Sequence, residues 1–162
     1  MCVRKTSIAV EFCYRRKQER PCDHIFWVYG NSEGTLGANY IGIYQAIRRQ
    51  STVRAIIQRL DCKEDDPERQ IEVVRLWLEV PCSGGWTMIV DNLDDVPENL
   101  NKYLRNCRGT ILFTTCNADL FTTYKRVSAT AVITVLTMSN EEATEQFSKL
   151  LGPTIPCHHS GC

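Results

Sequence analysis

Three short stretches of the sequence carry residue types that bind phosphates and divalent cations. The first is Lys5-Thr6, which matches the last two positions of the phosphate-binding pattern G-x-x-x-x-G-K-[ST]. There the lysine reaches the terminal phosphates, the hydroxyl binds magnesium, and the glycines let backbone N–H groups curl around the phosphates. Arg4 stands at the second glycine position, and the first would lie before residue 1. On local evidence alone, the start of a solvated basic helix is the better interpretation of this pair.

The other two stretches are polar residues at the ends of apolar runs. Asp91 follows the run 86–90, and at the carboxyl end of a parallel strand an acid lies where open α/β sheets bind ligands. Such a carboxylate can hold Mg²⁺, usually through water, although an Asp-rich turn would have the same composition. The run 110–113 is followed by Thr114 and Thr115. Hydroxyls at this position can contact a terminal phosphate, and they also occur at ordinary strand ends.

Strands and helices that alternate along the chain must position these residues. Nearly continuous apolar runs predict buried strands at 25–29, 86–90, 110–114 and 131–136. Helical periodicity predicts helices at 5–17, 36–47, 53–60, 71–78 and 143–151, the last with Asn140 as its N-cap. This alternation predicts an α/β fold with a mainly parallel sheet, in which the first element is a helix.

Composition excludes several classes of protein. The 162 residues have a formal net charge of zero, which argues against a broadly basic nucleic-acid binder or membrane-surface binder. The longest uncharged runs fall short of the ~18 apolar residues of a membrane span, and the charges at Arg4, Lys5 and Glu11 interrupt any signal peptide. Nine cysteines without a C-x-x-C pair indicate mostly reduced, buried or half-buried thiols in a cytoplasmic protein.

The order and spacing of these stretches resemble the NB-ARC nucleotide-binding domain of the STAND class of P-loop NTPases, particularly fungal NLR-like proteins. The resemblance covers residues 5–152 and depends most on three segments: 25–29 (IFWVY), 89–95 (IVDNLDD) and 136–143 (LTMSNEEA). It implies a P-loop NTPase-like three-layer sandwich whose first strand, the Walker A strand, is missing. Residues 1–152 would form a partial NB-ARC domain, and 153–162 a disordered tail.

The resemblance also implies roles for individual residues. Lys5 would neutralise the β- and γ-phosphates, Ser7 and Thr115 would contact the nucleotide, and Thr6 would coordinate magnesium. Asp91 would be the Walker B acid and the second magnesium ligand. The implied cofactor is therefore ADP or ATP with Mg²⁺. No residue is assigned a catalytic role.

The sequence departs from the family pattern at several of these positions. Met1, Cys2 and Arg4 stand where the family carries glycines, and side chains there would crowd the phosphates. Asn92 replaces a second acid, and Cys116 replaces the sensor arginine. The missing strand would leave two edges inside the sheet unpaired.

The function expected from the resemblance is an ADP/ATP-binding regulatory switch, impaired in nucleotide binding because its phosphate loop is incomplete. Hydrolysis would be slow at most. Its partners would be nucleotide and other proteins, or a second copy of itself, and neither nucleic acid nor membrane. The alternative is a non-nucleotide remnant or decoy that acts as a protein-interaction module. A tail cluster, Cys157-His158-His159-x-x-Cys162, has zinc-ligand residue types, but its spacing is too tight for one tetrahedral site.

Overall fold

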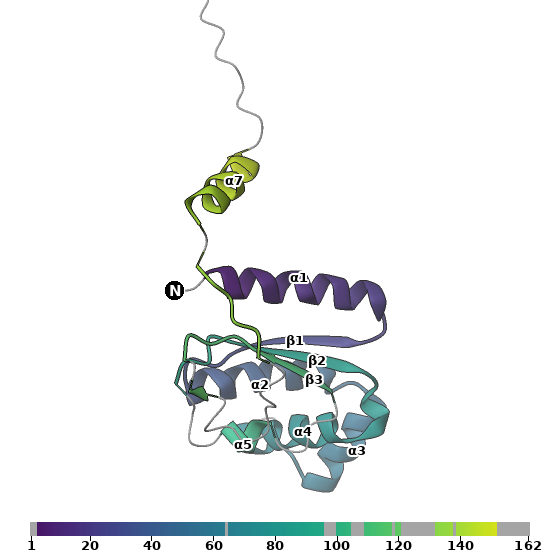
Figure 1. Ribbon diagram of the computed structural model, residues 1–162. Coiled ribbons are helices and arrows are strands. Elements are labelled where there is room, and N and C mark those ends of the chain that lie inside the picture. The colour runs from purple at the N-terminus through teal and green to yellow at the C-terminus, as the bar shows by residue number, and fades with distance from the viewer. Residues whose placement is uncertain are drawn as a thin grey trace, which may run out of the picture. The chain divides into compact units, whose positions relative to one another are not determined.

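Three apolar runs form a parallel sheet in the computed structural model of the chain, which describes residues 3–63, 65–95, 100–104, 109–117, 119–120, 132–137 and 139–151 (Figure 1). The strands are β1 (His24–Tyr29), β2 (Trp86–Asp91) and β3 (Thr110–Phe113), in the order β1-β2-β3. Tyr29 pairs with Asp91, and Val90 with Phe113, so the carboxyl ends of the strands meet at one edge. Every residue of β2 is buried, because this central strand is covered on both faces. The three predicted strands are thus confirmed.

Helices cover both faces of the sheet. Within Met1–Ala131, the first of two compact units, the described α-helices are α1 (Val3–Glu19), α2 (Glu33–Ile47), α3 (Ser51–Leu60), α4 (Pro67–Glu79) and α5 (Leu100–Tyr103). A 3₁₀ turn, η1 (Pro81–Ser83), leads into β2. In Figure 1, α1 lies along one face of the sheet, and the other four helices lie on the opposite side. This α/β arrangement is compatible with both a Rossmann-like and a P-loop-like layout.

The main core lies between the sheet and helices α2 and α4. Its largest fully buried side chains include Trp77 of α4, Tyr40 of α2 and Met88 of β2. The Tyr40 hydroxyl donates a hydrogen bond to the carbonyl of Tyr103 at 2.9 Å, which ties α2 to α5. The indole of Trp86 donates to the carbonyl of Leu78 at 3.2 Å. These two hydrogen bonds pair buried polar atoms of Tyr40 and Trp86, whereas the buried Trp77 indole N–H and Thr87 hydroxyl have no hydrogen-bond partner among the described residues.

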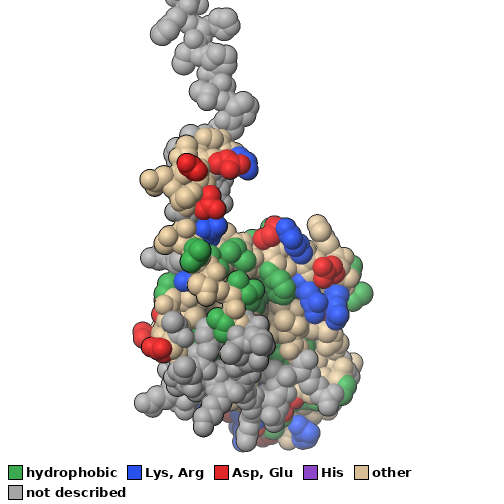
Figure 2. All heavy atoms as spheres, viewed as in Figure 1, with side chains coloured by type: hydrophobic (Ala, Val, Ile, Leu, Met, Phe, Trp, Pro, Cys, Tyr) green, Lys and Arg blue, Asp and Glu red, His purple; other side chains and the backbone are tan. Residues whose placement is uncertain are grey.

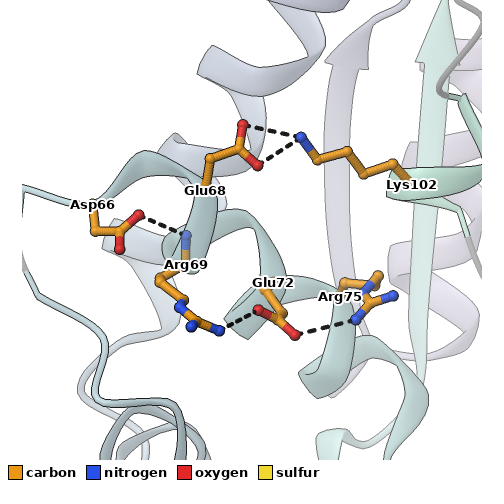
Figure 3. Close-up of polar contacts among 6 residues, drawn as sticks. All are labelled: Asp66, Glu68, Arg69, Glu72, Arg75 and Lys102. Atoms are coloured by element: carbon orange, nitrogen blue, oxygen red, sulfur yellow. Dashed lines mark hydrogen bonds and ion pairs between the residues drawn. The ribbon is translucent and has the colours of Figure 1, made fainter.

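Local sequence explains where the helices on this face begin. Ser32 accepts the Thr35 N–H at 3.1 Å and caps α2, and Asp66 accepts the Arg69 N–H at 3.1 Å and caps α4. The outer face of α4 is then lined by ion pairs (Figure 3): Arg69–Glu72, Arg75–Glu72 and Lys102–Glu68. Exposed pairs of this kind stabilise by about 0–1 kcal/mol each, so the buried apolar face holds α4 in place.

Helix α1 is the described layer on the second face, and it is incompletely covered. Ala9 is buried against the sheet, but Ile8, Val10 and Tyr14 are exposed. Lys and Arg side chains gather over its C-terminal half (Figure 2), where Arg16 and Lys17 occupy the last turn. Cations there complement the negative end of the helix dipole. The helix thus presents apolar and basic side chains to the solvent.

The second unit, Val132–Cys162, differs from the predictions. The predicted strand at 131–136 is wrong over the described part: residues 132–137 have no regular secondary structure, and Ile133 is 84% exposed. A strand needs a hydrogen-bonding neighbour as well as β-forming side chains. Helix α7 (Asn140–Leu151) is confirmed, but Asn140 is not its cap. Ser139 and Glu142 form a reciprocal capping box, Ser139 N–H to Glu142 Oε2 at 3.0 Å and Glu142 N–H to Ser139 Oγ at 3.2 Å.

The structure also bears on the sequence predictions about cysteines and membrane spans. Four described cysteines are free thiols: Cys13 and Cys62 are half-buried, and Cys22 and Cys116 are exposed. In the described ranges, no helix is long and apolar enough to cross a bilayer. The tail at 153–162, with its cysteine and histidine cluster, lies outside the described residues.

Candidate functional site

The candidate site lies where the carboxyl ends of β2 and β3 meet the N-terminal part of α1. Asp91 is the last residue of β2, and Thr114 follows the last residue of β3. Both are buried, Asp91 to 5% and Thr114 to 8% exposure. Thr6, in the first turns of α1, is brought to the same place from 85 residues away in the sequence. Three separate elements thus place oxygen-bearing side chains together at the sheet edge.

The Asp91 carboxylate is the centre of this arrangement. Thr6 Oγ1 donates to it, at 3.1 Å from Oδ1 and 3.3 Å from Oδ2. The hydroxyl of Thr114 donates to Oδ1 from the other side. Thr114 Oγ1 also accepts the Asn92 N–H at 3.0 Å, and Asn92 has a left-handed φ of 60°. The threonine therefore fixes both the carboxylate and the turn that follows it.

The close approach of β1 to β2 at this edge requires a glycine. The Gly30 N–H donates to the carbonyl of Asp91 at 2.7 Å. A Cβ added to Gly30 would lie 2.8 Å from Leu93 Cδ1, closer than real Cβ contacts. Gly30 therefore lets the chain leave β1 directly beside the Asp91 backbone.

Lys5 points to the end of β3. Its Nζ donates to Cys116 Sγ at 3.3 Å, a contact between residues 111 positions apart. Lys5 is half-buried, whereas Cys116 is exposed. The lysine amine therefore lies at the sheet edge, beside the residue that replaces the expected sensor arginine.

Asp94 connects the loops that follow β2 and β3. Its Oδ1 accepts the Cys116 N–H at 2.5 Å and the Thr115 hydroxyl at 3.3 Å. Its carbonyl accepts the Asn117 side-chain amide at 3.1 Å. We call these three hydrogen bonds the Asp94 clasp. It holds the two loops in one arrangement around the candidate site.

The structure brings together most of the residues that the sequence singled out. Thr6 and Asp91 are hydrogen-bonded, and Lys5 lies at the end of the neighbouring strand. Thr115 also reaches this edge, but it contacts Asp94 and not Asp91. Ser7, the next residue of α1, is exposed. The roles assigned to these residues remain predictions.

Sequence reasoning named Thr114 only as one of two strand-end hydroxyls that can contact a phosphate, and it assigned no individual role to Asp94. Thr114 was available as the first hydroxyl after the third strand, but nothing in the sequence shows which of two adjacent threonines turns inward. The parallel register decides this, because Val90 pairs with Phe113 and places Thr114 beside Asp91. Asp94 lies in the acidic run after β2, where the sequence does not distinguish a ligand-binding acid from a loop acid.

The side chains at this edge fit a magnesium ion that is also bound by phosphates. Carboxylate and hydroxyl oxygens are hard ligands suited to Mg²⁺, which typically takes one or two protein oxygens and fills its octahedron with water and phosphate. Asp91 with Thr6 supplies such a pair. Among the described residues, no group of three or more His, Cys, Asp or Glu could hold a metal ion.

Comparison of the chain with models of known protein families, with curated proteins and with solved structures found no match.

Proposed function

We propose that the edge formed by α1, β2 and β3 binds the phosphates and the magnesium ion of ADP or ATP, and that the chain is a regulatory nucleotide switch of the NB-ARC type. The observation that supports this proposal best is the hydrogen bond between Thr6 and the Asp91 carboxylate. A hydroxyl from the start of a helix and an acid from the end of a central strand are the two protein ligands of magnesium in a phosphate-binding loop protein.

Each residue has a distinct task in this proposal. Thr6 and Asp91 share the magnesium ion, and Lys5 turns from Cys116 to the β- and γ-phosphates. Ser7 and Thr115 complete the contacts with the nucleotide. Binding energy then comes mainly from charge-assisted hydrogen bonds to phosphate oxygens, which are stronger than neutral ones.

The proposed affinity is low and the proposed turnover slow. Cys2 and Arg4 have side chains where a phosphate loop needs glycine, and so fewer backbone N–H groups can reach the phosphates. Asn92 is exposed and lacks the carboxylate that would position an attacking water. A chain of this kind works through occupancy and partner binding, with slow hydrolysis at most.

A titration of the purified chain with fluorescent ADP and Mg²⁺ tests the proposal. We expect weak, saturable binding that Lys5→Ala weakens by about tenfold or more, because a lysine–phosphate hydrogen bond contributes about 1.5–3 kcal/mol. Lys63→Ala removes an exposed lysine between α3 and α4 and serves as the matched control. Equal titration curves for the two variants would refute the site. If the wild-type chain binds ADP with micromolar affinity and Lys5→Ala abolishes this binding, the proposed site is correct but the proposed low affinity is wrong.

A second function is favoured by the exposed apolar residues of α1. Ile8, Val10 and Tyr14 are exposed apolar side chains on a helix that also carries cations, which suits a protein-interaction module. In this alternative the chain associates with a related subunit or with itself and is indifferent to nucleotide. Sedimentation with and without Mg-ADP distinguishes the two functions. Nucleotide-independent association that Tyr14→Ser weakens would support the interaction module.

A further inference from the structure

The contact between Lys5 and Cys116 joins an amine to a thiol at the candidate site. Lys5 Nζ and Cys116 Sγ are 3.3 Å apart. Both residues are anchored by their neighbours: the Cys116 N–H donates to Asp94, and Thr6, next to Lys5, donates to Asp91. The fold thus places the backbones of the two residues close together at the sheet edge, although 111 positions separate them in the sequence.

This geometry suits a covalent reaction under oxidising conditions. A peroxide converts a thiol to a sulfenic acid and is itself reduced to water, and the sulfenyl sulfur then accepts a nitrogen nucleophile. The lysine ammonium first gives one proton to the solvent. The nitrogen–sulfur bond then forms as the sulfur–oxygen bond breaks, and the hydroxyl leaves as water with a second proton from the amine. The product is a sulfenamide, and the net loss from the protein is two hydrogen atoms.

We propose that Lys5 and Cys116 form a reversible redox crosslink, a sulfenamide produced by hydrogen peroxide and reversed by thiols. The structure favours Cys116 over the other described thiols. Burial raises the pKa of the Cys13 and Cys62 thiols, which lowers their reactive thiolate fraction. Cys22 is exposed, but within the described ranges its sulfur has no hydrogen bond from a lysine.

The crosslink would control the site in a simple way. In the sulfenamide, the Lys5 nitrogen is tied to Cys116 and has lost its ammonium charge. It can no longer neutralise phosphate. This regulatory consequence rests on the proposed function, whereas the crosslink itself depends only on the contact between the two side chains.

Peptide mapping of the full chain after treatment with hydrogen peroxide tests the crosslink. We expect a peptide pair that joins Lys5 to Cys116, with a mass about 2 Da below the sum of the reduced peptides, and its loss after addition of a thiol. Lys5→Arg and Cys116→Ser each abolish this pair, and Cys22→Ser retains it. Circular dichroism confirms that each variant is folded. Sulfenic or sulfinic acid at Cys116 without the link, or a disulfide from Cys116 to another cysteine, would overturn the proposal.

Titration of the oxidised chain with fluorescent Mg-ADP tests separately whether the crosslink prevents nucleotide binding. We expect oxidation to reduce binding by the wild-type chain by at least the factor seen for Lys5→Ala, and a thiol to restore it. Cys116→Ser should bind equally before and after peroxide. If the reduced chain itself binds no nucleotide, the proposed function fails. If mapping then still finds the link, the crosslink stands and only its regulatory consequence is overturned.

Discussion

Thr114 and Thr87 allow a direct comparison of two buried hydroxyls in the same sheet. Thr114 Oγ1 donates to Asp91 and accepts the Asn92 N–H. Thr87 lies in β2 with an exposure of 0%, and its hydroxyl has no hydrogen-bond partner among the described residues. Valine has the shape of threonine without the hydroxyl, so the same substitution removes two hydrogen bonds at one site and none at the other.

The expected changes in stability have opposite signs. A hydrogen bond to a charged group contributes about 1.5–3 kcal/mol and a neutral one about 0.5–1.5 kcal/mol, so Thr114→Val should lower the free energy of unfolding by about 3 kcal/mol. For a chain of this length that corresponds to a fall in Tm of about 6–12 °C. Thr87→Val removes an unpaired buried hydroxyl and should raise stability by about 1 kcal/mol.

Urea unfolding followed by tryptophan fluorescence measures both values, because Trp77 and Trp86 are buried in the core. Thr114→Ser keeps the hydroxyl and should recover most of the loss. If Thr114→Val and Thr87→Val change the free energy of unfolding by the same amount, the assigned hydrogen bonds at Asp91 do not stabilise the fold, and the reasoning is refuted.

Three further predictions concern other parts of the chain. Stability should fall as the pH rises above 9, because in the folded chain the pKa is raised for Cys13, Cys62, Lys102 and Tyr103. A raised pKa in the folded chain means that the unfolded chain loses these protons at lower pH, so alkaline pH favours unfolding. Cys62→Ala should therefore reduce the slope of the unfolding free energy against pH. An unchanged slope would contradict this prediction. Ser139→Ala should lower hydrogen-exchange protection in the first turn of α7 by the equivalent of about 1 kcal/mol, and Asn140→Ala should not. Tyr40→Phe should cost about 1 kcal/mol in urea unfolding, since it removes the bond to the Tyr103 carbonyl, and wild-type stability would argue against that bond.

Much of the fold was predictable because the central strands are apolar on both faces. The run that forms β2 was predicted to be a strand buried on both faces, and in the structure all six of its residues are buried. The run at 131–136 has similar composition but does not form a strand in its described part, because pairing depends on a neighbour that local sequence does not specify. Ser139 was overlooked as a cap because Asn140 is also a good capping residue. Only the reciprocal bonds with Glu142 distinguish the two.

The sequence predicted that the candidate site lies at the ends of the strands, but it did not predict which side chains contact one another there. Asp91 was identified because an acid that closes an apolar run stands out in the sequence. Its partners depend on register and on the placement of α1, which a single sequence does not encode locally. For this reason Thr6 was foreseen from the Lys-Thr match to the phosphate-binding pattern and not from any link to Asp91, and the sequence did not show that Thr114 is the threonine that contacts Asp91.

The Asp94 clasp has a mechanical consequence. The Asp94 side chain binds the Cys116 backbone and the Thr115 hydroxyl, and the Asp94 carbonyl binds the Asn117 side chain, so three hydrogen bonds join the loops after β2 and β3. Moving one loop away from the other would break these bonds, so we expect the two loops to move together rather than separately. A ligand that displaces the loop after β2 would therefore also displace the loop after β3.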